Sequence, residues 1–182
     1  MNHPVNTGAN NATSTPAAAT SHPNAGCRAL LIASAVALVL TIADQWTKFA
    51  ITSNLRYGES VAITWFFNLV LVYNKGAAFS FLSNADGWQR FFFIGITIGA
   101  IGLLSWLIVK HESEKLFRWG LTLILGGAIG NLIDRIAYGH VIDFLDFHFA
   151  GWHFWAFNVA DSAITVGAAL LILDSFRARP SA

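Results

Sequence analysis

The sequence predicts an all-α integral membrane protein with four transmembrane helices and a small extracytoplasmic β segment between the first two helices. Charged residues make up only 12% of the 182 residues, about half of their share in typical soluble proteins. Hydrophobic residues reach 55% and aromatic residues 14%, and the mean hydropathy is +0.54. Because so little polar surface is available, a lipid bilayer is the solvent that suits this composition.

Composition also excludes several classes of protein. The apolar content is far too high for a disordered chain. The net charge is +1, which gives no strong attraction to nucleic acid. Cys27 is the single cysteine, so an internal disulfide, a cysteine-rich zinc site and an iron–sulfur cluster are all excluded.

The predicted spans cover about residues 29–51, 91–109, 117–138 and 157–176, since roughly 20 helical residues cross the hydrocarbon. The second stretch is free of charge, and the other three contain charged residues. The first stretch lacks a basic segment beyond Arg28 and three more spans follow it, so we expect an anchor and not a cleaved signal peptide.

The remaining segments are tails and connections. Residues 1–26 contain no Lys, Arg, Asp or Glu and almost no large apolar residue, so we predict a disordered tail. One membrane domain then covers residues 27–178, and residues 179–182 form a short C-terminal tail. The segment 60–80 is rich in β-branched and aromatic residues and predicts two or three strands. We expect the segment 139–156 to be an aromatic, His-rich loop.

Helix packing and orientation are predicted by small and basic residues. Gly95-x-x-x-Gly99 and Gly126-x-x-x-Gly130 indicate close helix contacts. Four spans place both termini on one side, with six basic residues there: Arg28, Lys110, Lys115, Arg118, Arg177 and Arg179. The other side holds five: Lys48, Arg56, Lys75, Arg90 and Arg135. This small excess favours cytoplasmic termini and places the strands and the aromatic loop outside.

Charged side chains within the spans call for a reason, because a carboxylate at the bilayer centre costs roughly 2.5–3.5 kcal/mol. Asp44 and Lys48 are four positions apart, which predicts an ion pair on one helix face. Asn131, Asp134 and Arg135 share a face of the third span. We expect a structural hydrogen-bonded cluster there that holds the bundle together, above all through Asp134 and Arg135.

Asp161 is the only formally charged residue between Phe147 and Leu173. Either Asp143 or Asp146 can reach it if the chain turns back into the fourth span, and the spacing alone does not choose between them. Two carboxyl groups brought together do not both ionise readily, so one acts as a base and the other keeps its proton. Such a pair suits hydrolysis, in which one carboxylate deprotonates water and the other protonates the departing amine.

Other readings of the same residues remain open on spacing alone. A proton- or ion-coupled transporter would use Asp44, Asp134 and Asp161 as a relay, although no internal repeat is apparent. A structural assembly factor would pack through its glycine faces and would not need paired aspartates. A metal site is disfavoured because the spacing of His140, His148 and His153 fits no metal motif.

Five sequence blocks, in order, resemble the bacterial lipoprotein signal peptidases, also called type II signal peptidases. The blocks are Asp44-Gln45-Trp46-Thr47-Lys48, Asn74-Lys75-Gly76-Ala77-Ala78-Phe79-Ser80, Gly126-Gly127-Ala128-Ile129-Gly130-Asn131-Leu132-Ile133-Asp134-Arg135, Gly139-His140-Val141-Ile142-Asp143-Phe144 and Ala156-Phe157-Asn158-Val159-Ala160-Asp161-Ser162. Trp155 stands where many members of that family have Pro, which affects the local loop and not the chemistry.

The resemblance implies an aspartic endopeptidase of the bacterial inner membrane that cuts diacylglyceryl-modified prolipoproteins just before the lipidated cysteine. It implies Asp143 and Asp161 as the catalytic pair. It also implies a set of substrate-contacting or site-supporting residues, namely Asn74, Gly76, Asn131, Arg135, Asn158, Asp44 and Lys48. Membrane lipid and the inhibitor globomycin are the other expected partners. No metal or organic cofactor is expected, and the active site would lie near the outer face.

Overall fold

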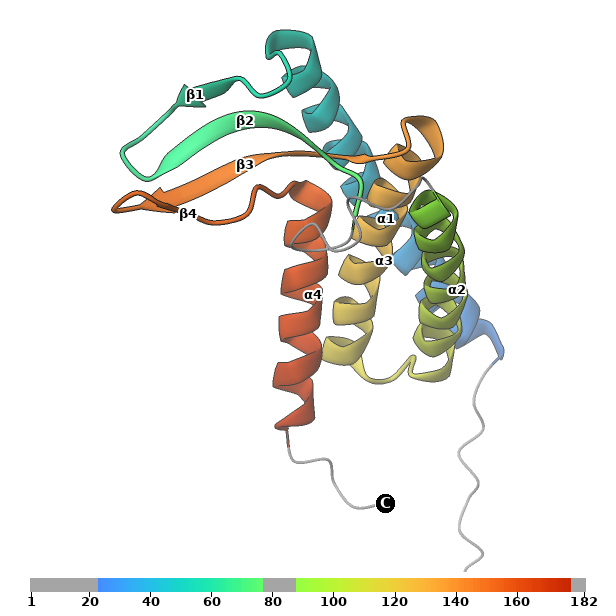
Figure 1. Cartoon of the computed structure of the whole chain (residues 1–182). Coiled ribbons are helices and arrows are strands. Elements are labelled where there is room, and N and C mark those ends of the chain that lie inside the picture. The colour runs from blue at the N-terminus through green and yellow to red at the C-terminus, as the bar shows by residue number, and fades with distance from the viewer. Residues whose placement is uncertain (1–22, 77–87, 178–182) are drawn as a thin grey trace, which may run out of the picture.

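The computed structural model describes residues 23–76 and 88–177 and shows four helices with a small sheet at one end (Figure 1). The helices are α1 (Pro23–Asn54), α2 (Trp88–Lys110), α3 (Lys115–Ala137) and α4 (Val159–Ser175). The strands are β1 (Ser60–Ala62), β2 (Phe67–Asn74), β3 (Val141–Phe149) and β4 (Trp152–His153). The start of α1, the α2–α3 turn and the end of α4 all lie opposite the sheet.

Three helices are long and apolar enough to cross a membrane. They are Gly26–Asn54 within α1, with a mean hydropathy of 2.1, α2, with 2.3, and α3, with 1.4. The fourth predicted span corresponds to α4, which has 17 residues and runs beside α3 (Figure 1). Helix α1 starts at Pro23, before residue 29, where the first predicted span begins. The rest of the predicted tail, residues 1–22, and residues 178–182 lie outside the described residues.

The sheet differs from the prediction in where its strands come from. Its order is β1-β2-β3-β4, and every neighbouring pair is antiparallel. The predicted segment supplies β1 and β2, and its last residues, Ala77–Ser80, lie outside the described residues. The segment expected to be an aromatic loop supplies β3 and β4, so that expectation was wrong. In the central pairing, Val72 lies opposite Asp143 and Asn74 opposite Val141.

Helix α3 lies at the centre of the bundle and packs against the other three helices. Small residues permit its close approach to α4: a Cβ on Gly167 would stand 2.6 Å from the carbonyl oxygen of Gly120, and one on Gly127 would collide with the carbonyl of Ala160. The predicted packing through Gly126 and Gly130 is confirmed against α1, because a Cβ on Gly126 would stand 3.1 Å from Cα of Ala37 and one on Gly130 would stand 2.6 Å from Oδ2 of Asp44. A hydrophobic core between α1, α2 and α3 completes the interior, with Ala33, Ala37, Leu104, Ile108, Leu121 and Leu125.

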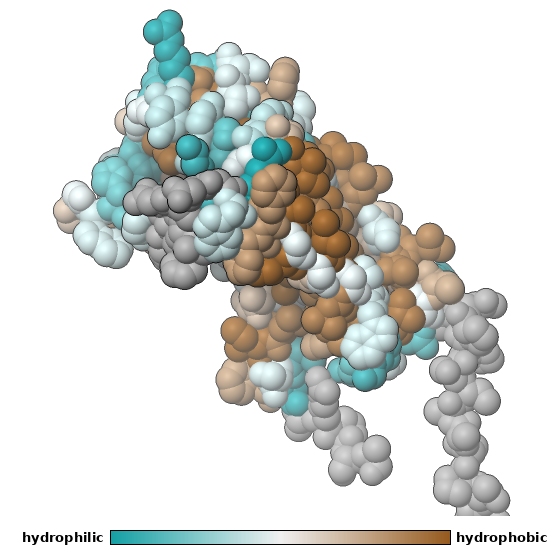
Figure 2. Space-filling view, turned by 45° about the vertical axis from the view of Figure 1, so that its right-hand side comes forward, coloured by the Kyte–Doolittle hydropathy of each residue, from teal (hydrophilic) through white to brown (hydrophobic). Residues whose placement is uncertain are grey.

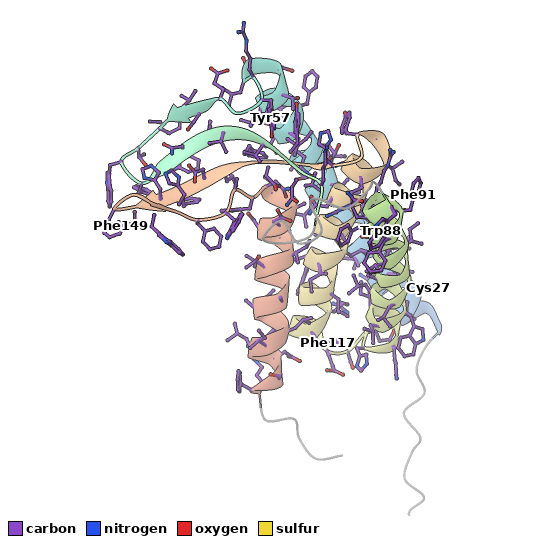
Figure 3. The ribbon with its side chains drawn as sticks, in the orientation of Figure 1. Cys27, Tyr57, Trp88, Phe91, Phe117 and Phe149 are labelled. Atoms are coloured by element: carbon purple, nitrogen blue, oxygen red, sulfur yellow. The ribbon has the colours of Figure 1, made fainter. Side chains whose placement is uncertain are left out.

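The outside of the bundle is apolar. Figure 2 shows a hydrophobic band over the helices, with hydrophilic residues at the sheet end. Phe91 at the sheet end of α2 is 72% exposed, and Phe149 extends from the far end of the sheet (Figure 3). The predicted close packing through Gly95 and Gly99 was wrong, because a Cβ at either position would meet no atom of the described chain within 4 Å. This surface of α2 suits contact with lipid.

Candidate active site

Asn158 begins α4 and connects the two aspartates that the sequence resemblance selects. Its Oδ1 accepts the backbone N–H of Asp161 at 2.9 Å, which is the contact of an N-cap residue. Its Nδ2 donates to Oδ1 of Asp143 at 2.7 Å. Because the cap fixes which end of the amide is the acceptor, the donor end must face Asp143.

Asp143 lies on β3 and is buried. A second amide, that of Asn74 on β2, donates to its Oδ2 at 3.2 Å. Burial and the neighbouring charge of Asp161 raise the pKa of Asp143 to about 7, although the two amide donors oppose this rise. At neutral pH this carboxyl group is therefore divided between its acid and its ionised form.

Asp161, in the first turn of α4, receives its own amide donor. Asn131 on α3 donates from Nδ2 to Oδ1 of Asp161 at 2.7 Å. The opposite end of that amide accepts Lys48 Nζ at 3.1 Å, so its orientation is fixed as well. Each of the two aspartates thus faces an asparagine whose donor end is turned toward it by a separate contact.

The two carboxyl groups line one cavity of about 310 Å³ between the sheet and the sheet end of α4. Asn74, Asn131 and Arg135 line it as well. Its remaining wall is largely apolar and aromatic, formed by Val72, Tyr73, Val141, Phe154, Trp155, Ala156, Phe157, Ile164 and Thr165. The cavity therefore combines a small polar floor with apolar walls, as is usual for sites that bind organic ligands.

Arg135 and Gly76 form the edge of this site where β2 ends. The Nη2 of Arg135 donates to the carbonyl of Gly76 at 3.1 Å, and the N–H of Gly76 donates to Oδ1 of Asn74 at 3.0 Å. Arg135 also lies over the ring of Phe93. The guanidinium thus positions the turn that carries Asn74.

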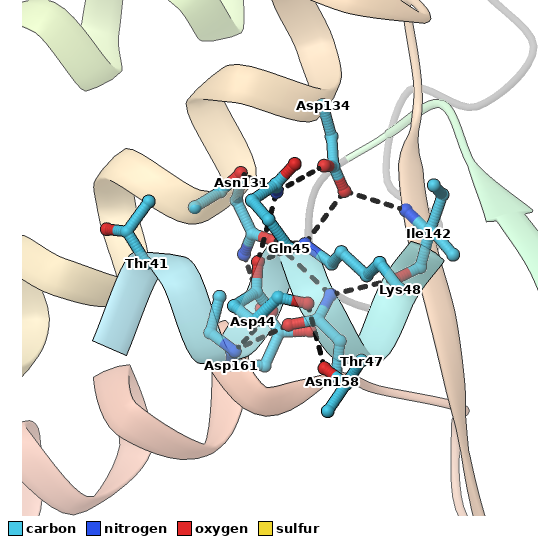
Figure 4. A network of polar contacts seen from close by, with 12 residues as sticks. Thr41, Asp44, Gln45, Thr47, Lys48, Asn131, Asp134, Ile142, Asn158 and Asp161 are labelled. Atoms are coloured by element: carbon cyan, nitrogen blue, oxygen red, sulfur yellow. Dashed lines mark hydrogen bonds and ion pairs between the residues drawn. The ribbon is translucent and has the colours of Figure 1, made fainter. Parts of the chain in front are cut away.

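A buried ion cluster lies behind the cavity (Figure 4). Lys48 Nζ is 2.7 Å from Asp44 Oδ2 and 2.8 Å from Asp134 Oδ2. The predicted pair of Asp44 and Lys48 is confirmed. Asp134 turns toward α1, whereas Arg135 turns toward Gly76, because adjacent residues of a helix point about 100° apart.

Asp146, the alternative left open by spacing, lies elsewhere. It accepts Asn68 Nδ2 at 2.9 Å, is 2.9 Å from His153 Nδ1, and does not line the cavity. One connecting residue was missed: Gln45 donates from Nε2 to Asp134 Oδ1 at 2.8 Å and to the carbonyl of Gly130 at 3.2 Å. Its place inside the block Asp44–Lys48 was the available signal. The described residues contain no group of three His, Cys, Asp or Glu side chains placed to hold a metal ion.

The apolar helices, together with two carboxyl groups on one cavity at the sheet end of the bundle, define a membrane protein with a polar pocket at one end. The family described as Signal peptidase (SPase) II matches residues 36–177, and the chain belongs to this family of peptidases.

Individual proteins of known name or structure are similar to this chain over most of its length. A lipoprotein signal peptidase of Janthinobacterium sp. (strain Marseille) is 61% identical over 142 residues, which are 78% of this chain and 86% of that protein. One from Burkholderia vietnamiensis (strain G4 / LMG 22486) is 58% identical over the same shares. A solved bacterial membrane enzyme, determined by the in meso method at 1.9 Å, is 32% identical, has a TM-score of 0.72, and matches over 81% of this chain and 94% of that one.

Proposed function

We propose that this protein is an aspartic endopeptidase that removes the signal peptide from diacylglyceryl-modified prolipoproteins, cutting on the N-terminal side of the lipidated cysteine. Membership in the signal peptidase II family supports the substrate class. The observation that carries the mechanism is the presence of Asp143 and Asp161 on one cavity, each with a fixed amide donor.

In this mechanism the pair shares one proton before the reaction. Asp143, whose pKa is raised to about 7, holds that proton, and Asp161 accepts one from water as the water oxygen attacks the scissile carbonyl carbon. Asp143 then protonates the amide nitrogen as the carbon–nitrogen bond breaks. Asn74 and Arg135 lie beside the pair and hold the peptide backbone of the substrate.

The substrate would reach this site along the membrane. We propose that all four helices span the bacterial inner membrane, with both termini cytoplasmic and the sheet at the outer face. A prolipoprotein held by its own lipid then diffuses in two dimensions, and its cleavage site meets the cavity near the outer interface. Globomycin would occupy the same cavity.

The test is cleavage of a diacylglyceryl-modified prolipoprotein by the purified protein in detergent. Asp143→Asn and Asp161→Asn should each lower the rate by at least roughly 1,000-fold, since general acid and base each contribute up to about 10⁴-fold. Asp146→Asn is the matched control, because Asp146 is buried on the same strand but contacts Asn68 and His153. It should cleave within about threefold of the wild type.

Globomycin should block the cleavage. Substantial activity in either the Asp143 or the Asp161 variant would contradict their role as the catalytic pair. Loss of activity in Asp146→Asn would indicate that Asp146 belongs to the active site. If the folded wild-type protein cleaves nothing, ion or solute uptake into liposomes tests the transporter alternative.

A further inference from the structure

Lys48 lies at the centre of a buried triad that touches neither reacting carboxyl group. Its ammonium group contacts Asp44 and Asp134, and all three side chains are at most 2% exposed. None of the three lines the cavity. Burying three charged groups carries a desolvation cost of several kcal/mol per ion, so a role beyond holding the helices together is expected.

Each of the two carboxylates of the triad also accepts a hydrogen bond from a backbone N–H, and the two bonds occupy equivalent positions. Asp44 Oδ1 accepts the backbone N–H of Ala160 at 2.9 Å. Asp134 Oδ2 accepts the backbone N–H of Ile142 at 3.1 Å. Ala160 immediately precedes Asp161, and Ile142 immediately precedes Asp143. Each carboxylate therefore holds the main chain one residue before one of the paired aspartates.

We propose that Asp44, Lys48 and Asp134 form a backbone clamp that sets the position of Asp143 relative to Asp161. This inference rests on the proposed function, in which those two aspartates are the catalytic residues. The three clamp residues are positioning residues, and they act through the main chain of β3 and of α4.

The clamp is needed because its two targets belong to different elements. Asp143 is carried by a strand and Asp161 by the first turn of a helix, and within the described residues their side chains are connected through Asn158 and Asn131. Lys48 links the two carboxylates that hold these elements. Its third contact, to Asn131, orients the amide that donates to Asp161. A misplacement of about 1 Å at a reacting group lowers a rate by roughly 100-fold.

Paired substitutions separate the hydrogen bond from the charge. Asp134→Asn and Asp44→Asn each keep an oxygen acceptor for the backbone N–H, whereas Asp134→Leu and Asp44→Leu keep the volume and lose that acceptor. In each single variant Lys48 keeps one carboxylate partner, so the remaining buried ion pair carries no net charge. We expect kcat per active site, with sites counted by globomycin titration, to fall about 100-fold in the leucine variants. The asparagine variants should stay within about tenfold, and KM should change little in all four.

Thr41→Val is the matched structural control. Thr41 donates from Oγ1 to the carbonyl of Gly126 at 3.2 Å. It therefore joins α1 to α3, as the clamp does, from a buried position outside the clamp. Its loss should lower stability without changing kcat per active site.

Amide hydrogen exchange tests the clamp independently of cleavage. Exchange at Ile142 should speed up by at least roughly tenfold in Asp134→Leu, and exchange at Ala160 in Asp44→Leu, while the asparagine variants keep both amides protected. Equal losses of kcat in the leucine and asparagine variants would overturn the clamp, as would unchanged exchange in the leucine variants. If the wild type cleaves no prolipoprotein, the proposed function fails, and the exchange result still decides whether the clamp exists.

Discussion

The amide nitrogen of Asn158 lies 2.7 Å from a carboxyl oxygen of Asp143, while the oxygen of the same amide caps the helix that carries Asp161. One side chain thus performs two tasks that substitution separates. Asn158→Asp keeps an oxygen for the cap but places a carboxylate against Asp143. Asn158→Ala loses both contacts.

We therefore expect Asn158→Asp to lower kcat by roughly 100-fold and, because Asn158 is fully buried, to lower thermal stability more at high pH than at low pH, where one of the two carboxyl groups is protonated. Asn158→Ala should lose activity and also about 1 kcal/mol of stability from the missing cap. Ser162→Ala, on the same turn of α4, is the control, because within the described residues its hydroxyl bonds to the carbonyl of Asn158 and to no side chain. Thermal unfolding and cleavage rates measured on the same samples distinguish the variants. An active Asn158→Asp variant would contradict the donor role.

The pH dependence of cleavage should report the raised pKa of Asp143, about 7. Above that pH, the pair loses the proton that the departing amine requires. We expect kcat/KM to decline on the alkaline side with a midpoint near pH 7 and to fall about tenfold per pH unit beyond it. A profile that stays flat to pH 9 would exclude Asp143 as the proton donor.

The same carboxyl group links folding stability to pH. Its ordinary pKa is 3.8 and its folded value about 7, so between these values the folded protein holds a proton that the unfolded chain has released. Stability therefore falls as the pH rises through this window, and the loss is complete above about pH 7.

Asp143→Asn has no such proton and should escape this loss. The difference in unfolding temperature, variant minus wild type, should be larger at pH 8 than at pH 5, by an amount on the order of 5 °C. The comparison between the two pH values removes the constant effect of changing the hydrogen bond with Asn74. An identical offset at both pH values would show that Asp143 titrates normally.

Two glycines allow a matched test of helix packing. A Cβ on Gly130 would stand 2.6 Å from Asp44 Oδ2, which cannot retreat because Lys48 and the N–H of Ala160 hold that side chain. Gly130→Ala should therefore cost about 1–3 kcal/mol. Gly99→Ala meets no described atom within 4 Å and should leave the unfolding temperature unchanged or higher. Equal losses in the two variants would contradict the close approach of α1 and α3.

Local patterns in the sequence predicted the helices well. Each of the four helices was visible as an apolar stretch, and the ion pair of Asp44 and Lys48 followed from their spacing on one helix face. These features depend on residues within a few turns of each other, so neighbouring residues carry the information. The same local view did not reveal the ionic partner of Asp134, because that partner, Lys48, lies on another helix.

Features that join distant segments could not be predicted from spacing. Strand β3 pairs with β2 across 67 positions, from Asn74 to Val141, and its aromatic composition alone resembled a loop. The choice between Asp143 and Asp146 likewise followed from family resemblance, since only the register of β3 sends Asp143 to the cavity and Asp146 to Asn68. Gln45 was missed because its partners, Asp134 and the carbonyl of Gly130, lie on another helix, and only its place inside the block Asp44–Lys48 pointed to it.

The pairing of β2 with β3 also has a consequence for the order in which the chain is made. A ribosome that adds about 5–20 residues per second completes β2 before it starts α2 and α3, so β2 waits several seconds for its partner. Asp161 follows later still, in α4. The cavity is therefore incomplete until α4 has been made, and a growing chain that stops before α4 carries Asp143 without Asp161.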